Sequence, residues 1–165
     1  MNKLENMALL TQNLAMQIEK WTHDTNQFET QIPGLTLTHW TSPTPITSHT
    51  HKSGICLIAQ GEKRVILGEE NFIYDANHFL ISSIELPVMA NIMKASNEKP
   101  FLGLVMELDL QEISQLIVDS ELTFNSDSNA QKGIAVGELS EPLVNAFIRL
   151  LTLLDEPDSI KILAS

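Results

Sequence analysis

The middle of the chain is a series of short apolar runs separated by turn residues, and this spacing leaves no room for helices. The runs cover residues 55–59, 64–67, 72–74 and 78–83, with turns at 60–61, 68–71 and 75–77. Short apolar runs bounded by Gly, Asn and Asp are typical of antiparallel strands joined by tight connections. We therefore expect an antiparallel meander in this part of the chain.

Three further segments extend the expected sheet. Residues 35–40 alternate between apolar and polar side chains, and residues 88–95 and 101–108 alternate in the same way. Roughly seven short strands at regular spacing predict a β-sandwich or a small barrel. Residues 42–53 contain two prolines and little apolar pattern, so we expect a loop or a ragged edge there rather than a central strand.

Helices are expected on both sides of the β region. Six apolar residues recur at steps of three and four and predict an amphipathic helix over residues 3–22: Leu4, Met7, Leu10, Leu14, Ile18 and Trp21. The sequence Asp109-Leu110-Gln111-Glu112 has the form of a capping box and predicts a short helix. Residues 125–132 are rich in Ser, Asn and Asp and predict a loop.

A last helix is predicted to begin at Ser140-Glu141-Pro142, because proline is favoured in the first turn. Its apolar stripe consists of Leu143, Phe147, Leu150, Leu151 and Leu154. This stripe either packs on the strands or forms a seam with a second copy of the chain. Residues 160–163 begin another apolar segment.

Composition excludes some classes of partner. The 165 residues fit one domain, and the formal net charge of −11 opposes binding to phosphate backbones or anionic membranes. No apolar stretch approaches the length that spans a bilayer, and no secretory leader is recognisable. Because the single cysteine, Cys56, cannot form an internal disulfide, we expect a cytoplasmic protein.

Histidines give the one candidate metal site. His49 and His51 are two residues apart, so on a strand their imidazoles point to the same side and could share one ion. His78 could supply a third nitrogen, as in a metal-dependent cupin enzyme. Such enzymes also need a carboxylate a few residues after the pair, where this chain has Gly54-Ile55-Cys56. We therefore expect no metal and no cofactor, with the three-histidine enzyme as the alternative.

Other reactive side chains have simpler interpretations. Cys56 lies in an apolar run and is either a buried small side chain or a thiol nucleophile, although no basic residue is adjacent in sequence. His39 is either half-buried or a ligand. Trp40 either packs under the first helix or lines an interior pocket. No nucleophile elbow or phosphate-binding loop is present, so we expect no enzymatic activity.

The chain resembles the N-terminal regulatory domain of AraC-type transcriptional regulators. Matching pieces occur in order over about residues 25 to 155: Pro33-Gly34-Leu35, Ser42-Pro43-Thr44, Cys56-Leu57, Gln60-Gly61 with Lys63, Leu67-Gly68, Tyr74-Asp75-Ala76, His78-Phe79-Leu80, Leu86-Pro87-Val88, Ala95-Ser96, Pro100 and Leu108-Asp109. Two departures are His51-Lys52-Ser53, where the family often has an aromatic residue and a proline, and Asn77, where it usually has glycine.

The resemblance implies a mainly β fold with flanking helices: an N-terminal helix over residues 1–24, a cupin-like antiparallel β-barrel over 25–108, and a helical dimerisation segment over 109–165. It also implies a following helix-turn-helix domain that would contact DNA. We expect that this domain is missing and that the chain is a truncated form of the regulator.

The expected function is therefore effector sensing and homodimerisation, with an unknown small molecule as effector. Candidate pocket residues are Trp40, Leu57, Phe79, Ile81 and Met106, and strand alternation allows some of them to face inward. Candidate dimerisation residues are Leu143, Phe147, Leu150, Leu151 and Leu154. A barrel that dimerises without sensing anything is a further alternative.

Overall fold

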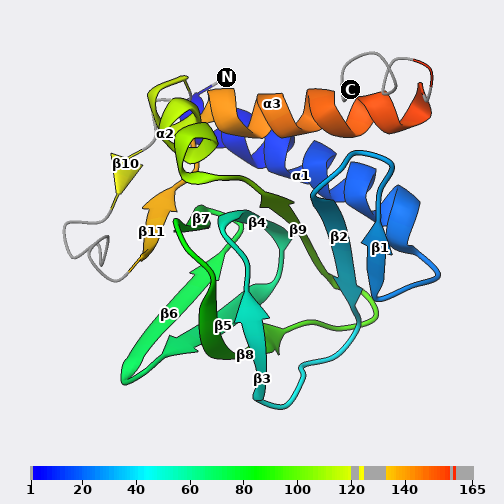
Figure 1. Ribbon diagram of the computed structural model, residues 1–165. Coiled ribbons are helices and arrows are strands. Elements are labelled where there is room, and N and C mark those ends of the chain that lie inside the picture. Colours follow the sequence, from blue (N-terminus) through cyan, green and yellow to red (C-terminus); the bar gives the residue numbers. More distant parts are fainter. Residues whose placement is uncertain (1, 120–122, 125–132, 157, 159–165) are drawn as a thin grey trace.

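The computed structural model describes residues 2–119, 123–124, 133–156 and 158, and two antiparallel sheets form its centre (Figure 1). The seven-stranded sheet has the order β1 (Gln27–Glu29), β2 (Leu35–Trp40), β9 (Phe101–Glu107), β4 (Gly54–Gln60), β7 (His78–Ser82), β11 (Ile134–Glu138) and β10 (Thr123–Phe124). The four-stranded sheet has the order β3 (Thr47–His51), β8 (Leu86–Lys94), β5 (Glu62–Leu67) and β6 (Glu70–Asp75).

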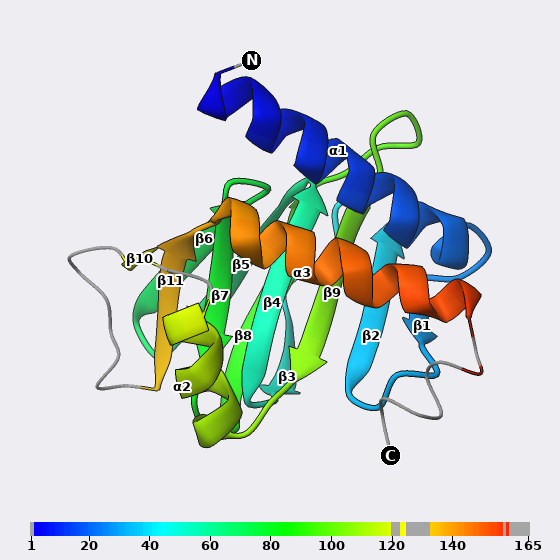
Figure 2. The ribbon, with the colours of Figure 1, turned by 90° about the horizontal axis from the view of Figure 1, so that it is seen from above.

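Two long helices cover one face of the seven-stranded sheet. Figures 1 and 2 both show α1 (Lys3–Thr22) and α3 (Glu141–Thr152) lying across its strands, with α2 (Leu110–Asp119) at one end. The 3₁₀ turn η2 (Leu153–Asp155) follows α3. The four-stranded sheet packs on the opposite face, so the molecule has a helix layer and two sheet layers.

Two separate cores result from this layering. The helix-side core contains Leu14 and Ile18 of α1, Leu37 of β2 and Leu143 of α3, all without exposed surface. The core between the sheets contains Cys56, Val65, Tyr74 and other interior side chains. Strand β4 is buried over almost its whole length because it contributes side chains to both cores. The seven-stranded sheet therefore separates two apolar compartments.

The helix ends follow the sequence signals. Asp109 Oδ1 accepts a hydrogen bond from the Glu112 backbone N–H at 2.8 Å, and Glu112 Oε1 accepts one from the Asp109 N–H at 3.0 Å. This reciprocal pair confirms the predicted capping box. The Ser140 side chain caps α3 by accepting from the Leu143 N–H. The Lys20 ammonium lies 2.6 Å from the Asp155 carboxylate and links the end of α1 to η2.

Gly54 lets β4 start close to β9. Its φ of 146° is rarely adopted by other residues, and a Cβ atom there would overlap the Met106 carbonyl oxygen. This close approach brings the residues just before β4 next to the interior between the sheets.

The predicted fold class, mainly antiparallel β with flanking helices, is confirmed. The region predicted as ragged contains β3, which lies at an edge of the four-stranded sheet and is mostly exposed. The pairings form two facing sheets rather than one continuous ladder among the described residues.

The sequence patterns did not predict strands β1, β10 and β11. The predicted loop at 125–132 and the segment at 160–163 lie outside the described residues. None of the described helices combines the length and apolar character needed to cross a bilayer.

Candidate functional site

A cavity of about 660 Å³ lies between the two sheets. Its wall includes Trp40 of β2, His49 and His51 of β3, Cys56 of β4 and Lys63 of β5. The charged residues Glu29, Lys52 and Glu107 also line it. Threonine hydroxyls and apolar side chains contribute further surface: Thr36, Thr38, Thr44, Thr47, Ala90, Ile92 and Val105. Cavities of this size that combine apolar surface with polar groups are typical of small-molecule sites.

Strand alternation explains why these side chains face the cavity. On β3, His49 is directly opposite Val88 and His51 is opposite Leu86, and Val88 is buried in the core between the sheets. Cross-strand partners share a face of a sheet, so both imidazoles point inward. Their ring centroids lie 6.4 Å apart. His49 is exposed at the edge strand, whereas His51 is only 5% exposed.

His51 is held by three polar neighbours. Its Nδ1 lies 3.1 Å from the Lys52 carbonyl oxygen and 2.9 Å from Ser82 Oγ, and its Nε2 lies 3.6 Å from Cys56 Sγ. A carbonyl oxygen only accepts hydrogen bonds, so Nδ1 carries the proton. Nε2 is then the acceptor, and the Cys56 thiol donates to it. This network joins β3, β4 and β7 and fixes the imidazole in one orientation.

The same environment keeps these groups uncharged. Burial lowers the pKa of His51 to about 4, and the positive charge of Lys63 adds to this shift. Burial also lowers the pKa of His49, again with a contribution from Lys63. Burial raises the pKa of the Cys56 thiol, more than Lys63 lowers it, and raises the pKa of Tyr74 well above its usual value. At neutral pH the cavity therefore contains neutral imidazoles and a protonated thiol.

This chemistry suits binding rather than nucleophilic catalysis. A reactive cysteine needs its thiolate form, which a neighbouring imidazolium or a helix N-terminus stabilises. Here the Cys56–His51 pair is a thiol and a neutral imidazole within a buried hydrogen-bond network. The two side chains instead form an uncharged polar patch in the cavity wall.

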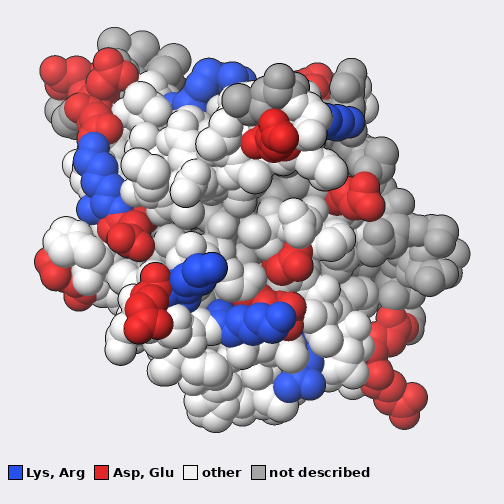
Figure 3. Space-filling model, turned by 180° about the vertical axis from the view of Figure 1, so that it is seen from behind, with Lys and Arg blue, Asp and Glu red and all other residues white. Residues whose placement is uncertain are grey.

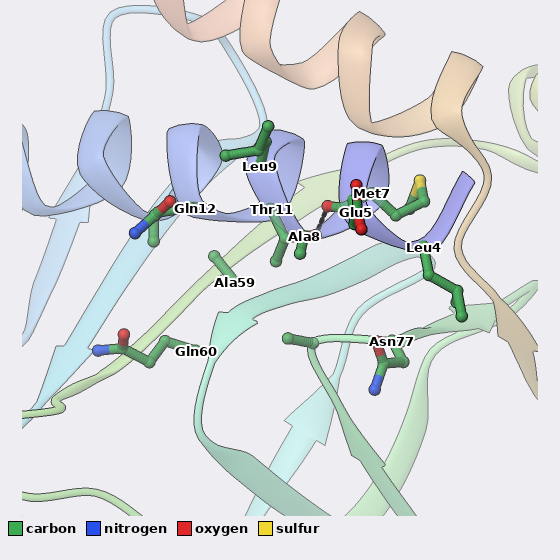
Figure 4. Close-up of a pocket in the computed structure, with 12 residues that line it drawn as sticks. Leu4, Glu5, Met7, Ala8, Leu9, Thr11, Gln12, Ala59, Gln60 and Asn77 are labelled. Atoms are coloured by element: carbon green, nitrogen blue, oxygen red, sulfur yellow. Dashed lines mark hydrogen bonds between the residues drawn. The ribbon is translucent and has the colours of Figure 1, made fainter. Parts of the chain in front are cut away.

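A second hollow, of about 700 Å³, lies beside the first half of α1. Figure 4 shows it between α1 side chains, including Leu4, Ala8 and Gln12, and the ends of neighbouring strands at Gln60 and Asn77. Glu5 is its only charged lining residue. This groove offers an apolar surface with amides but no set of polar groups that converge on one point. The cavity between the sheets is therefore the better candidate site.

The family comparison agrees with this architecture. The model of the AraC-type transcriptional regulator N-terminus matches residues 31–165 of the chain. The chain belongs to this family. No curated protein matches the AraC-type domain described here.

Two solved structures are similar to the domain at low identity. An apo ToxT variant from Vibrio cholerae has a TM-score of 0.44 and 6% identity, over 75% of this chain and 49% of that chain. A cupin-2 domain containing protein from Shewanella frigidimarina has a TM-score of 0.30 and 10% identity, over 49% of this chain and 76% of that chain. The AraC-type domain thus spans about half the length of the ToxT chain.

The structure does not bring the three predicted histidine ligands together. His51 contacts Ser82 at the end of β7, whereas His78 begins that strand, about 13 Å away at the usual rise per residue. His78 Nδ1 instead lies 3.0 Å from the Asp75 carboxylate. Within the described part of the domain, no group of three or more His, Cys, Asp or Glu side chains is arranged to hold a metal ion. The three-histidine alternative therefore fails on geometry.

The predicted pocket residues divide between the two faces of the seven-stranded sheet. Trp40 lines the cavity. Leu57, Phe79, Ile81 and Met106 belong to the helix-side core or pack against it, so they do not line this cavity. Their strands are buried on both faces, and alternation alone did not say which face encloses the interior. Whether a ligand contacts them stays untested.

The predicted dimerisation stripe lies mostly inside one protomer. Leu143, Phe147, Leu151 and Leu154 are buried in the helix-side core, and only Leu150 is half-buried. The stripe therefore packs the domain's own helices on its sheet, which was the first of the two interpretations of its apolar pattern.

The sequence reading missed the polar network around His51 and the position of Lys63. Ser82 was not singled out, and distance along the sequence did not show that the His51 imidazole contacts the Cys56 thiol. Strand alternation could have indicated that Lys63 faces the interior. Lys63 and Val65 are two residues apart on one strand, so their side chains share a face, and Val65 is an evident core residue.

Proposed function

We propose that this domain is the effector-sensing part of an AraC-type transcriptional regulator, and that the effector is a small molecule bound between the two sheets. The observation that carries this proposal is the cavity itself. It combines apolar surface, threonine hydroxyls, a tryptophan and a fixed polar network in a domain whose family is regulatory. The proposed role is non-catalytic and cytoplasmic.

Sensing requires that the effector favour one conformation of the regulator. Binding shifts an equilibrium only by the difference in affinity between its two states. The cavity is suited to such coupling because strands of both sheets line it: β3, β5 and β8 on one side and β2, β4 and β9 on the other. An effector between them contacts both sheets at once and would alter their separation.

We propose that a different part of the regulator contacts DNA. The net charge of −11 makes these residues an unfavourable partner for phosphate backbones. On the face shown in Figure 3, Lys and Arg side chains lie beside Asp and Glu side chains and form no continuous basic area. The resemblance implies a helix-turn-helix domain for this task.

Homodimerisation is the second part of the proposal. Because Leu143, Phe147, Leu151 and Leu154 are used within the protomer, a second copy would have to contact side chains that this packing leaves accessible, including Leu150. Sedimentation of the 165-residue chain over a range of concentrations tests this part. A monomer at all concentrations would count against dimerisation through this domain.

A thermal-shift screen with a library of small metabolites tests the sensing proposal. A ligand that binds only the folded state raises the midpoint of unfolding. We expect at least one compound to raise it in a saturable manner. The same compound should lose its effect in Thr47→Trp, because Thr47 lies opposite Ala90 and lines the cavity.

Ser48→Trp is the matched control. Ser48 follows Thr47 on the same exposed edge strand but lies opposite Met89, on the outer face of the sheet. This variant should respond to the ligand as the unmodified chain does. Equal responses from both variants, or no shift from any compound, would contradict binding between the sheets.

A further inference from the structure

Lys63 is a charged residue at a position that strand alternation assigns to the interior. It lies directly opposite Tyr74 on one neighbouring strand and Ile92 on the other. Both partners belong to the core between the sheets, and Val65, two residues further along β5, has no exposed surface. The Lys63 side chain therefore starts on the interior face and lines the cavity.

The other lysine on the cavity wall has a different environment. Lys52 Nζ lies 3.5 Å from a Glu107 carboxylate oxygen, and both side chains are about half exposed. Glu29, the other acidic lining residue, is exposed on β1. Lys63 itself forms no ion pair with any residue that the structure describes. Its effect on the pKa of His49, His51 and Cys56 places its charge close to all three.

The Lys63 side chain is partly buried and has no ion-pair partner among the described residues, so its ammonium is available to an anion in the cavity. His49, His51 and Cys56, which line the same cavity, are neutral and supply no negative charge. Trp40 and Val105 on the seven-stranded sheet offer apolar surface, with Val105 directly beside Cys56, and the volume accommodates a molecule of metabolite size. Of its two lysines only Lys52 is ion-paired among the described residues, so the site combines the Lys63 cation with an aromatic surface.

We propose that the cavity binds a small organic carboxylate, with its carboxylate group paired to the Lys63 ammonium and its apolar body against Trp40. This inference rests on the proposed sensing function and names the chemical class of the effector. Neutral His49 and the threonine hydroxyls would supply hydrogen bonds to the same end of the ligand. A cationic compound of similar shape would be rejected by Lys63.

Calorimetric titration of the 165-residue chain with phenylacetate and hexanoate tests the proposal. Their amides and amines, phenylacetamide with phenethylamine and hexanamide with hexylamine, are neutral and cationic analogues. We expect saturable binding of a carboxylate and at least tenfold weaker binding of its amide, since the amide carries no charge to pair with the ammonium. Perturbed imidazole NMR signals of His49 and His51 would locate the ligand.

Three variants give the chemical test. Lys63→Met keeps the length of the side chain but removes its charge, so carboxylate affinity should fall about 10-fold to 100-fold while amide affinity stays unchanged. Lys63→Arg should restore much of the carboxylate affinity. Lys94→Met is the control, because Lys94 pairs with Glu62 and does not line this cavity. Thermal midpoints recorded for every variant confirm that it is folded.

The outcomes separate this inference from the sensing function. If amides bind as tightly as carboxylates, or if Lys63→Met binds carboxylates normally, the carboxylate assignment is overturned while a sensing cavity stands. Failure of both carboxylates to bind also overturns the assignment, and the metabolite screen then decides the sensing function independently.

Discussion

At the scale of single residues, the interior between the sheets depends on groups that stay neutral. His51 is 5% exposed and is hydrogen-bonded through both ring nitrogens, to the Lys52 carbonyl and Ser82 on one side and Cys56 on the other. Protonating Nε2 would remove its capacity to accept from the thiol and would place a charge beside Lys63. The folded state therefore favours the neutral imidazole.

We predict that His51 makes folding sensitive to acid. Its pKa is about 4 in the folded state against an ordinary value of 6.5, so the unfolded chain binds the proton more readily. The contribution to stability is complete above about pH 6.5 and is lost as the pH falls towards 4. Between pH 7 and pH 4 the free energy of unfolding should decrease by on the order of 3 kcal/mol from this residue.

Denaturant unfolding of wild type and His51→Asn at a series of pH values measures this contribution. Asparagine keeps an N–H donor near the Lys52 carbonyl but does not titrate. The variant should be less stable at pH 7 and should lose less stability than wild type on acidification. Parallel pH profiles for the two proteins would show that His51 is not held neutral by the fold.

At the scale of secondary-structure elements, periodicity identified the strands but not the roles of their two faces. Strands β4, β7 and β9 are buried on both sides because helices cover one face of the sheet and a second sheet covers the other. Large apolar residues such as Leu57 and Phe79 pack towards the helices. The cavity is lined by smaller or polar residues such as Cys56 and Thr38, which a search for large apolar pocket residues passes over.

Helix α3 allows a test of how much packing in the helix-side core stabilises the fold. Phe147 is 4% exposed in the helix-side core, so Phe147→Ala should lower the free energy of unfolding by about 3–5 kcal/mol. Arg149→Ala, at an exposed position of the same helix, should change it by less than about 0.5 kcal/mol. Urea unfolding monitored by circular dichroism measures both changes.

The concentration dependence of that loss distinguishes packing from dimerisation. A residue that packs within one protomer destabilises it equally at all protein concentrations, whereas a residue at a seam between copies changes a midpoint that depends on concentration. A Phe147→Ala effect that appears only at high protein concentration would contradict the intramolecular assignment.

At the scale of the whole molecule, local signals predicted most of the architecture. The step-of-three-and-four pattern gave α1 with its observed bounds, and the capping box gave α2. Strand β11 was missed because Ile134–Glu138 is a short apolar run with two glycines nearby, and its place beside β7 depends on long-range pairing. The pairing of β3 with β8, which puts His49 and His51 inside, is equally non-local. The sequence thus predicted the elements better than the interior they enclose.

Binding of the effector between the two sheets can be tested directly with the chain's two tryptophans. Trp40 lines the cavity, whereas Trp21 packs on the helix-side core and stacks on Phe28 with ring centroids 6.0 Å apart. In Trp21→Phe, all tryptophan emission comes from Trp40. Titrating this variant with phenylacetate, or with a compound from the metabolite screen, should change the emission in a saturable manner.

The complementary variant Trp40→Phe reports on Trp21 alone, and its emission should not respond. Binding between the sheets requires that the response follow Trp40. A saturable response from Trp21, with none from Trp40, would place the ligand on the helix side of the sheet and contradict it.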